Sequence, residues 1–488
     1  MNRLLTVIRN RPYELLTTLA ILVFILFKLP DIGIPYHWDE MGVYVPAAFR
    51  MMDNGHISLL PASIEPLYSR GHPLLFTFCN ALVFKLFGET VTVGHIFALF
   101  LGVATLILFF LLAKSLFSKK IAFFATVLLM AQPIFFTMAV QVLPEMMVAF
   151  FTLLSFYGIL NKKWVIYALG GSLAMMTKES AIAIPATALI ALLIETIREK
   201  DLLTLKRMKL FLLGATPLLV FGLFLIIQKV QNGWYLFPEH LGYIHWVPAK
   251  LSKEAGRLFN DMLTGQGRWL TGIPFLAGIV LALFSKRLKI EAKGKNLWTF
   301  ALFILLVFIF CLVNYYLTRY ILYVIPFIIL GGTWTVLTML EKVFANLKGA
   351  QWVTVGLFCI YGVQLGHTNM MKSPDTCDMS YKRVVNVTQQ AIRWAEQNWS
   401  KDTIEANFPV FQAIEDPRNG YLAGKPIAYT ANYTHPRKYG VLFYMWDTTN
   451  IPIGPSLRYY IIKTFDDSWA HVAAVGFERT DSISPAAR

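Results

Sequence analysis

The sequence predicts an α-helical polytopic membrane protein with a small α/β domain at its C-terminal end. Three observations predict this fold class. Of the 488 residues, 56% are hydrophobic and only 15% are charged, whereas soluble domains usually have about 25% charged residues. Long apolar runs recur along the chain up to about residue 368. Beyond that point the runs stop and acidic residues become frequent.

The apolar runs give the membrane domain. A span needs about 20 apolar residues, and about eleven runs are of adequate length. They lie near residues 13–30, 91–113, 121–140, 145–160, 164–177, 181–197, 209–229, 269–285, 297–315, 319–340 and 351–367. The run 73–87 is amphipathic and contains Lys85, which favours an interfacial helix lying along the membrane surface. We therefore expect a transmembrane domain over residues 1–368.

Basic clusters between the runs predict the orientation. With the N-terminus in the cytoplasm, the alternate loops collect nearly all of them, and the positive-inside rule makes those loops cytoplasmic. The clusters lie in residues 114–120, 162–163, 198–209, 286–295 and 342–348. The opposite, outer side then receives two long loops, 31–90 and 230–268, and the tail 369–488. The net charge of +15 is scattered over these clusters. This excludes a nucleic-acid face and favours membrane lipids as partners.

The tail, residues 369–488, is predicted to form a periplasmic or extracellular α/β domain. Residues 381–399 show helical periodicity, with apolar side chains on one face. Residues 441–446, 459–464 and 472–477 are rich in aromatic and β-branched residues and predict strands. The four cysteines are scattered, with no metal-ligand spacing and no disulfide pattern.

Two adjacent acids, Asp39 and Glu40, follow the first apolar run. Acids at the mouth of a span are costly near lipid and are more often functional than decorative. A carboxylate beside a low-dielectric region tends towards a raised pKa, which suits a general base. Trp38 and Tyr44 would then shape the pocket. A solvated loop start or a helix N-cap is the alternative left open.

Four basic residues border apolar runs on the outer side and are predicted to bind a phosphate: Arg70, His72, Lys178 and Arg319. Each also has a structural interpretation. Arg70 and Arg319 would anchor helices at the interface, and Lys178 would pair with its neighbour Glu179.

Glu145 follows Pro144 at a predicted helix start, where an acid also stabilises the helix dipole. Its placement on the same side as Asp39 makes it a second acidic candidate. Tyr316 and Tyr320 flank the arginine before the next span, and together with Glu179 they are predicted to line the pocket. The placement of all these candidates on the same side of the membrane supports a functional site more strongly than any single residue does.

This set of residues resembles the GT-C superfamily of integral-membrane glycosyltransferases. It is most similar to the branch with protein O-mannosyltransferases and the aminoarabinose transferases that modify lipid A. The resemblance covers residues 10–340 well and the tail only in architecture. It is carried by Trp38-Asp39-Glu40 with Tyr44, Gly71-His72-Pro73-Leu74, Pro144-Glu145, Thr177-Lys178-Glu179, and Arg319-Tyr320 with Pro326.

The resemblance implies roles for individual residues. Asp39 takes the catalytic acidic position, Glu40 supports it, and Glu145 matches the second acidic position. Some members carry a lysine close to where Arg70 and His72 stand here, which implies phosphate contact at this place. Relatives commonly have Thr-Lys-Gly-Pro where this chain has Thr-Lys-Glu-Ser, so the role of Glu179 has no counterpart in the family pattern.

Members of this superfamily take a sugar from a polyprenyl-phosphate donor. The resemblance therefore implies hexosyl or pentosyl transfer, by inverting displacement, to a hydroxyl or amine of a glycan, lipid or protein. The expected location is the inner (cell) membrane of a bacterium or archaeon, with the site on the outer side. No cofactor and no metal ligand set are indicated, and a divalent cation near Asp39 and Glu145 is left open.

Two rival functions remain at this point. A transporter or flippase of a lipid-linked glycan would also be polytopic, but transporters tend to carry broken helices at mid-membrane in repeated halves. Here the polar groups stand at helix ends and no repeat is visible. A non-catalytic scaffold that presents the C-terminal domain is the second rival, and it would tolerate the loss of the Asp39 carboxylate.

Overall fold

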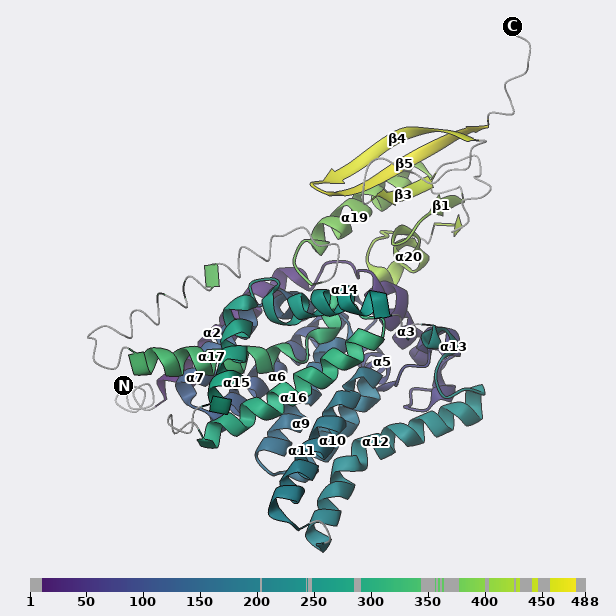
Figure 1. The fold of residues 1–488 in the computed structure, drawn as a ribbon. Coiled ribbons are helices and arrows are strands. Elements are labelled where there is room, and N and C mark those ends of the chain that lie inside the picture. Colours follow the sequence, from purple (N-terminus) through teal and green to yellow (C-terminus); the bar gives the residue numbers. More distant parts are fainter. Residues whose placement is uncertain are drawn as a thin grey trace, which may run out of the picture.

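The computed structural model has the predicted fold class, a mostly helical chain followed by a small α/β unit (Figure 1). It describes residues 11–201, 204–242, 244, 248–284, 291–343, 356, 359, 362–363, 377–399, 403–424, 427–430, 441–445 and 457–479. Within this part of the chain, four helices are long and apolar enough to cross a membrane: Pro12–Asp31, Val91–Leu116, Glu179–Glu199 and Leu205–Asn232. Shorter apolar helices accompany them, and the protein is an integral membrane protein.

The apolar helices follow the predicted runs closely. They are α2 (Pro12–Lys28), α6 (Val91–Leu116), α7 (Lys119–Ala131), α8 (Pro133–Met138), α9 (Pro144–Leu160), α10 (Trp164–Thr177), α11 (Ala183–Glu199), α12 (Leu205–Asn232), α15 (Trp269–Phe284), α16 (Glu291–Val313) and α17 (Ile325–Val343).

The predicted run 121–140 is two helices rather than one. Gln132 has an extended backbone, and Pro133 begins α8 as its first residue, because proline lacks the N–H that would continue α7. The run 351–367 lies largely outside the described residues.

The first long loop is itself helical. It contains η1 (Leu29–Asp31), η2 (Glu40–Tyr44), α3 (Val45–Asp53), η3 (Pro61–Ser63), α4 (Pro66–Ser69) and α5 (Leu75–Phe87). Helix α5 matches the amphipathic run 73–87 and packs against α3 and α6. The second long loop contains α13 (Pro238–Leu241), α14 (Pro248–Phe259) and η5 (Asn260–Thr264).

The C-terminal unit is built on α19 (Tyr381–Asn398), which forms because its apolar residues fall on one face that is buried against β4 and β5. The predicted strands are β3 (Val441–Met445), β4 (Leu457–Asp467) and β5 (Ala470–Arg479). Short strands β1 (Ile404–Ala406) and β2 (Tyr429–Thr430), and helices α20 (Val410–Glu415) and η8 (Pro417–Asn419), complete the unit.

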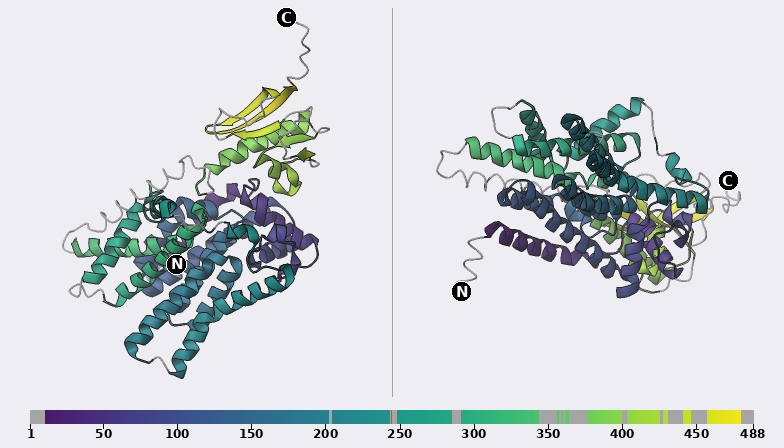
Figure 2. Two further views of the ribbon diagram at one scale, coloured as in Figure 1. Left: turned by 45° about the vertical axis from the view of Figure 1, so that its right-hand side comes forward. Right: turned by 90° about the horizontal axis from the view of Figure 1, so that it is seen from below.

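The sheet has the order β2-β1-β3-β5-β4. Strand β1 runs parallel to β2 and β3, whereas β5 pairs antiparallel with β3 and β4. The views in Figures 1 and 2 agree that this unit sits at one end of the helical bundle, next to the first long loop. The C-terminal unit is therefore in contact with the loop that carries the predicted acids.

Candidate active site

The backbone around Asp39 has an unusual conformation. Trp38 has a φ of 48°, in the left-handed region that non-glycine residues rarely adopt and that costs about 1–3 kcal/mol. The next residues, Glu40–Tyr44, form one turn of π-helix, a geometry found most often at functional sites. Asp39 lies between these two features, so the direction of its side chain is set by both.

The Asp39 carboxylate lies in a network of four charged side chains. The Arg319 guanidinium from η7 (Thr318–Ile321) donates to Asp39, and Arg319 Nε lies 3.6 Å from Glu145 Oε1. The same Glu145 oxygen accepts a hydrogen bond of 2.8 Å from Lys178 Nζ. Three of the four side chains are buried, whereas Asp39 is 32% exposed. Asp39 is therefore the member of this network that a substrate can reach.

Local structure explains why Lys178 reaches Glu145. Helix α10 ends at Thr177, Lys178 has an extended backbone, and a 3₁₀ turn (Glu179–Ile182) follows. Glu145 stands in the first turn of α9, directly after Pro144. The Lys178 ammonium also lies 3.4 Å from the centre of the Tyr320 ring, a cation–π contact that stabilises the charge. The sequence left open a local pair of Lys178 with Glu179. In the structure, the hydrogen-bond partner of Lys178 is Glu145 instead.

A pocket opens beside Lys178. Six of its lining residues are Tyr44, Tyr68, His72, Phe76, Thr177 and Lys178. His72 Nδ1 lies 3.1 Å from Glu179 Oε2, so Glu179 faces the histidine rather than the lysine. The lining combines aromatic rings with an ammonium and an imidazole, groups that can contact an apolar chain and an anion. The cavity of about 10 Å³ has room for about one water molecule.

The structure separates the four predicted phosphate-binding residues. Lys178 and His72 line the pocket together, and Arg319 joins Lys178 through Glu145. Arg70 is exposed at the end of α4, with a left-handed φ of 47°, and is not among the lining residues. Gly71 follows with a φ of 68°, and a Cβ there would lie 2.9 Å from Trp234 and Phe237. The second long loop thus packs directly on this turn.

Glu40 has a different environment from Asp39. Its buried carboxylate accepts hydrogen bonds from the backbone N–H of His37 (2.9 Å) and of Val142 (2.6 Å), and lies 3.2 Å from His95 Nε2. These partners come from the first loop, the segment before α9, and α6. Glu40 therefore ties together the segments that carry Asp39 and Glu145.

The two remaining aromatic candidates also fall in different places. Tyr320 lies under the Lys178 ammonium, inside the charged network. The Tyr316 hydroxyl instead donates to Asp261 Oδ2 at 3.2 Å and accepts from Arg257 Nε at 3.1 Å. Tyr316 thus ties the segment just before η7 to the second long loop. Neither Arg257 nor Asp261 could be selected from the sequence, because both lie in a charged loop with no distinctive spacing.

His37 directly precedes Trp38-Asp39-Glu40 and was not a predicted site residue. Its ring is fully buried between those of Trp38 (5.4 Å) and Tyr381 (5.5 Å). Burial, together with the positive charge of Arg319, lowers the pKa of His37 to about 3. His37 is therefore neutral at physiological pH, and its ring contacts Tyr381 of the C-terminal unit.

A divalent cation near Asp39 and Glu145 was left open by the sequence. Within the described residues, no group of three or more His, Cys, Asp or Glu side chains is arranged to hold a metal ion. The two carboxylates are instead bridged by the Arg319 guanidinium. The network has two formal negative and two formal positive charges, so it is balanced by its own side chains.

Comparison with known proteins agrees with this architecture. Residues 71–227 match the family model described as dolichyl-phosphate-mannose-protein mannosyltransferase. This matched segment contains His72, Glu145 and Lys178. No curated protein matches the chain as a sequence relative.

Solved structures share the fold over nearly the whole chain. ArnT from Cupriavidus metallidurans in the apo state is 15% identical, with a TM-score of 0.58 over 94% of this chain and 97% of ArnT. ArnT bound to undecaprenyl phosphate gives a TM-score of 0.56 with the same identity and coverage. The Archaeoglobus fulgidus oligosaccharyltransferase in the apo form is 12% identical, with a TM-score of 0.52 over 86% of this chain and 64% of that protein. The chain therefore shares the fold of these membrane glycosyltransferase structures, and its residues 71–227 are similar to the mannosyltransferase family.

Proposed function

We propose that this protein transfers a hexosyl or pentosyl sugar from a polyprenyl-phosphate donor to a hydroxyl or amine of an acceptor glycan, lipid or protein. The observation that carries the proposal is the network of Asp39, Arg319, Glu145 and Lys178 beside the pocket. It offers a reachable carboxylate for the acceptor and buried cations for the donor. The solved structure of ArnT bound to undecaprenyl phosphate has the same fold, which supports this class of donor.

The reaction is a single displacement. The acceptor oxygen or nitrogen attacks the anomeric carbon and forms the new glycosidic bond, while the bond from that carbon to the phosphate oxygen breaks. The electron pair leaves with polyprenyl phosphate, and the configuration at the anomeric carbon inverts. Asp39 accepts the proton of the attacking group. Arg319 keeps the Asp39 carboxylate oriented, since it donates to that side chain from a buried position.

The phosphate needs cations rather than a strong acid, because polyprenyl phosphate is already an anionic leaving group. The Lys178 ammonium has three N–H donors, of which one is used by Glu145. Lys178 and His72 both line the pocket, where charge-assisted hydrogen bonds would hold the phosphate. Preorganised charges of this kind supply much of the rate in enzymes that stabilise a developing anion.

Asp39→Asn tests the assignment of the base. The substitution keeps the volume of the side chain and removes its basicity. We expect sugar transfer to fall by about 10²-fold or more while donor binding stays nearly intact. Phe259→Ala, at an exposed position in the second long loop, is the control variant. It shows whether expression and purification of a variant alone lower the rate of sugar transfer. Turnover of Asp39→Asn within a few-fold of the wild-type rate would remove Asp39 from the mechanism.

The proposal places the site and the C-terminal unit on the outer side of a bacterial or archaeal cell membrane. The distribution of basic clusters supports this orientation. Single cysteines at Lys206 and Asn232, at the two ends of α12, provide a test. An impermeant thiol reagent added to intact cells should label the cysteine at position 232 and not the one at 206. The opposite result would put the site in the cytoplasm.

A further inference from the structure

The C-terminal unit touches the catalytic loop on both sides of Asp39. The Tyr36 backbone N–H donates to the Asn419 carbonyl oxygen at 3.1 Å. On the other side, a Cβ placed on Gly42 would lie 2.4 Å from the Gln412 amide nitrogen, so glycine allows this close approach. Both contacts join residues that are more than 300 positions apart in the sequence.

The ring contacts fall on the two residues immediately before Asp39. Phe408 lies 5.5 Å from Trp38 and Tyr381 lies 5.5 Å from His37, measured between ring centres. Trp38 has the left-handed backbone described above, and a strained residue keeps its conformation only where surrounding groups hold it. One of the groups that hold Trp38 belongs to the C-terminal unit.

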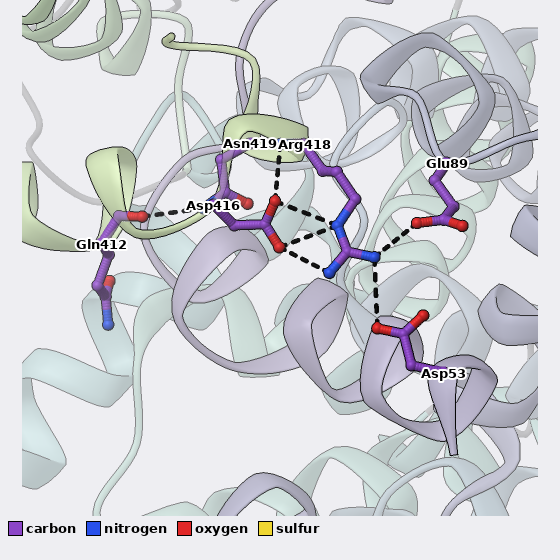
Figure 3. Close-up of polar contacts among 6 residues, drawn as sticks. All are labelled: Asp53, Glu89, Gln412, Asp416, Arg418 and Asn419. Atoms are coloured by element: carbon purple, nitrogen blue, oxygen red, sulfur yellow. Dashed lines mark hydrogen bonds and ion pairs between the residues drawn. The ribbon is translucent and has the colours of Figure 1, made fainter. Parts of the chain in front are cut away.

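An ionic contact fixes the same unit at the edge of the loop (Figure 3). The Arg418 guanidinium binds its neighbour Asp416 through Nε (2.9 Å) and Nη2 (2.7 Å). It also reaches Glu89 at 2.5 Å and Asp53 at 3.5 Å, both in the membrane domain. The guanidinium lies 4.0 Å from the centre of the Phe49 ring of α3. Arg418 thus connects the unit to the helix that directly follows the π-helical turn.

We propose that the C-terminal unit is a positioning element of the active site, with Phe408 and Arg418 as its positioning residues. By docking on residues 36–42 and on α3, it holds Trp38 in the left-handed conformation and so directs the Asp39 carboxylate towards Arg319. This inference rests on the proposed function for its catalytic part. The docking itself does not depend on which reaction the protein performs.

The test uses Phe408→Ala and Arg418→Ala in the full-length protein. Phe408 is 39% exposed and Arg418 is 31% exposed, so both variants should fold. Arg383→Ala is the matched control, because it also removes an arginine from an ion pair, but one with Asp467 inside the C-terminal unit. Phe408→Trp keeps a ring against Trp38 and is the rescue variant.

Two readouts separate positioning from general stability. Amide hydrogen exchange of residues 36–44 should become faster in Phe408→Ala and Arg418→Ala, and stay unchanged in Arg383→Ala. The kcat of sugar transfer should fall by about 10-fold, within the range that a displaced catalytic group can cost, while the KM for the donor changes less than about twofold. Phe408→Trp should restore both.

The outcomes are distinguishable. Unchanged exchange in both variants overturns the docking. Faster exchange with an unchanged kcat overturns the positioning role. If the wild-type protein transfers no sugar, the proposed function fails, while the exchange measurement still decides whether the C-terminal unit holds the loop.

Discussion

Arg319 and Arg418 each bind carboxylates from different segments of the chain, but in opposite surroundings. Arg319 is 3% exposed and lies between Asp39 and Glu145. Arg418 is 31% exposed and lies between Asp416, Glu89 and Asp53. A buried charge that loses its partner is strongly destabilised, whereas an exposed pair is screened by water and salt. The first arginine is therefore a member of the buried charged network, and the second connects two structural units.

The largest predicted effect comes from removing a carboxylate from the buried network around Arg319. Glu145→Gln keeps the shape but leaves Lys178 and Arg319 with one carboxylate fewer in a buried environment. We expect a loss of about 3–5 kcal/mol in the free energy of unfolding. At the exposed arginine, Glu89→Gln should cost about 0–1 kcal/mol. Thermal unfolding in one detergent measures both variants, and equal shifts would show that burial does not decide the strength of these pairs.

Much of the fold could be predicted because a membrane-spanning helix requires a long run of apolar residues, which is visible in the sequence. The apolar runs predicted the bounds of most helices, and the basic clusters between them predicted the loops on the cytoplasmic side. Pro133 divides one predicted span, which a count of apolar residues cannot register. The short strands β1 and β2 were also missed, since elements of two or three residues have no periodicity to recognise.

The candidate site was predicted as a list of residues rather than as a set of pairs. Asp39, Glu145, Lys178 and Arg319 do come together, because each stands at a helix end on the same side of the bundle. The pairing of Lys178 with Glu145 instead of Glu179 depends on tertiary packing. The contacts of Phe408 and Arg418 with the first loop span hundreds of residues, and no local sequence pattern encodes them.

The second prediction compares a lining cation with an exposed one. Lys178→Ala should weaken polyprenyl-phosphate binding by about 1.5–3 kcal/mol, the usual worth of a hydrogen bond to a charged group. Arg70→Ala should change it less, since Arg70 lies outside the pocket lining. Binding of polyprenyl phosphate and the melting temperature are measured on the same variants. A lower melting temperature with unchanged lipid affinity in Lys178→Ala would mean that the lysine only stabilises the fold.

The third prediction concerns the pH dependence of stability that follows from the burial of His37. His37 has a folded-state pKa of about 3, below its unfolded value of about 6.5. The unfolded chain therefore binds the proton first, so stability is complete above pH 6.5 and is lost as the pH falls towards 3. At pH 5 the loss from this group is about 2 kcal/mol, at about 1.36 kcal/mol per pH unit.

The substitution His37→Phe keeps an aromatic ring between Trp38 and Tyr381 and removes the titratable group. His37→Phe should therefore lower the pH dependence of the melting temperature between pH 7.5 and pH 5, by the amount that this group contributes. Equal slopes in the wild type and in His37→Phe would mean that the imidazole is protonated or hydrated in the folded state.

The smallest predicted effect is the response of the exposed Arg418 ion pairs to salt. Raising the salt concentration from about 0.1 M to about 1 M shortens the screening length from about 10 Å to about 3 Å. The Arg418 contacts with Glu89 and Asp53 should then weaken by up to about 1 kcal/mol, and amide exchange of residues 36–44 should become modestly faster. The buried pairs of Arg319 should be little affected, because salt ions do not reach them. In Arg418→Ala the response of residues 36–44 to salt should disappear. If it persists, charged contacts other than those of Arg418 produce the salt response.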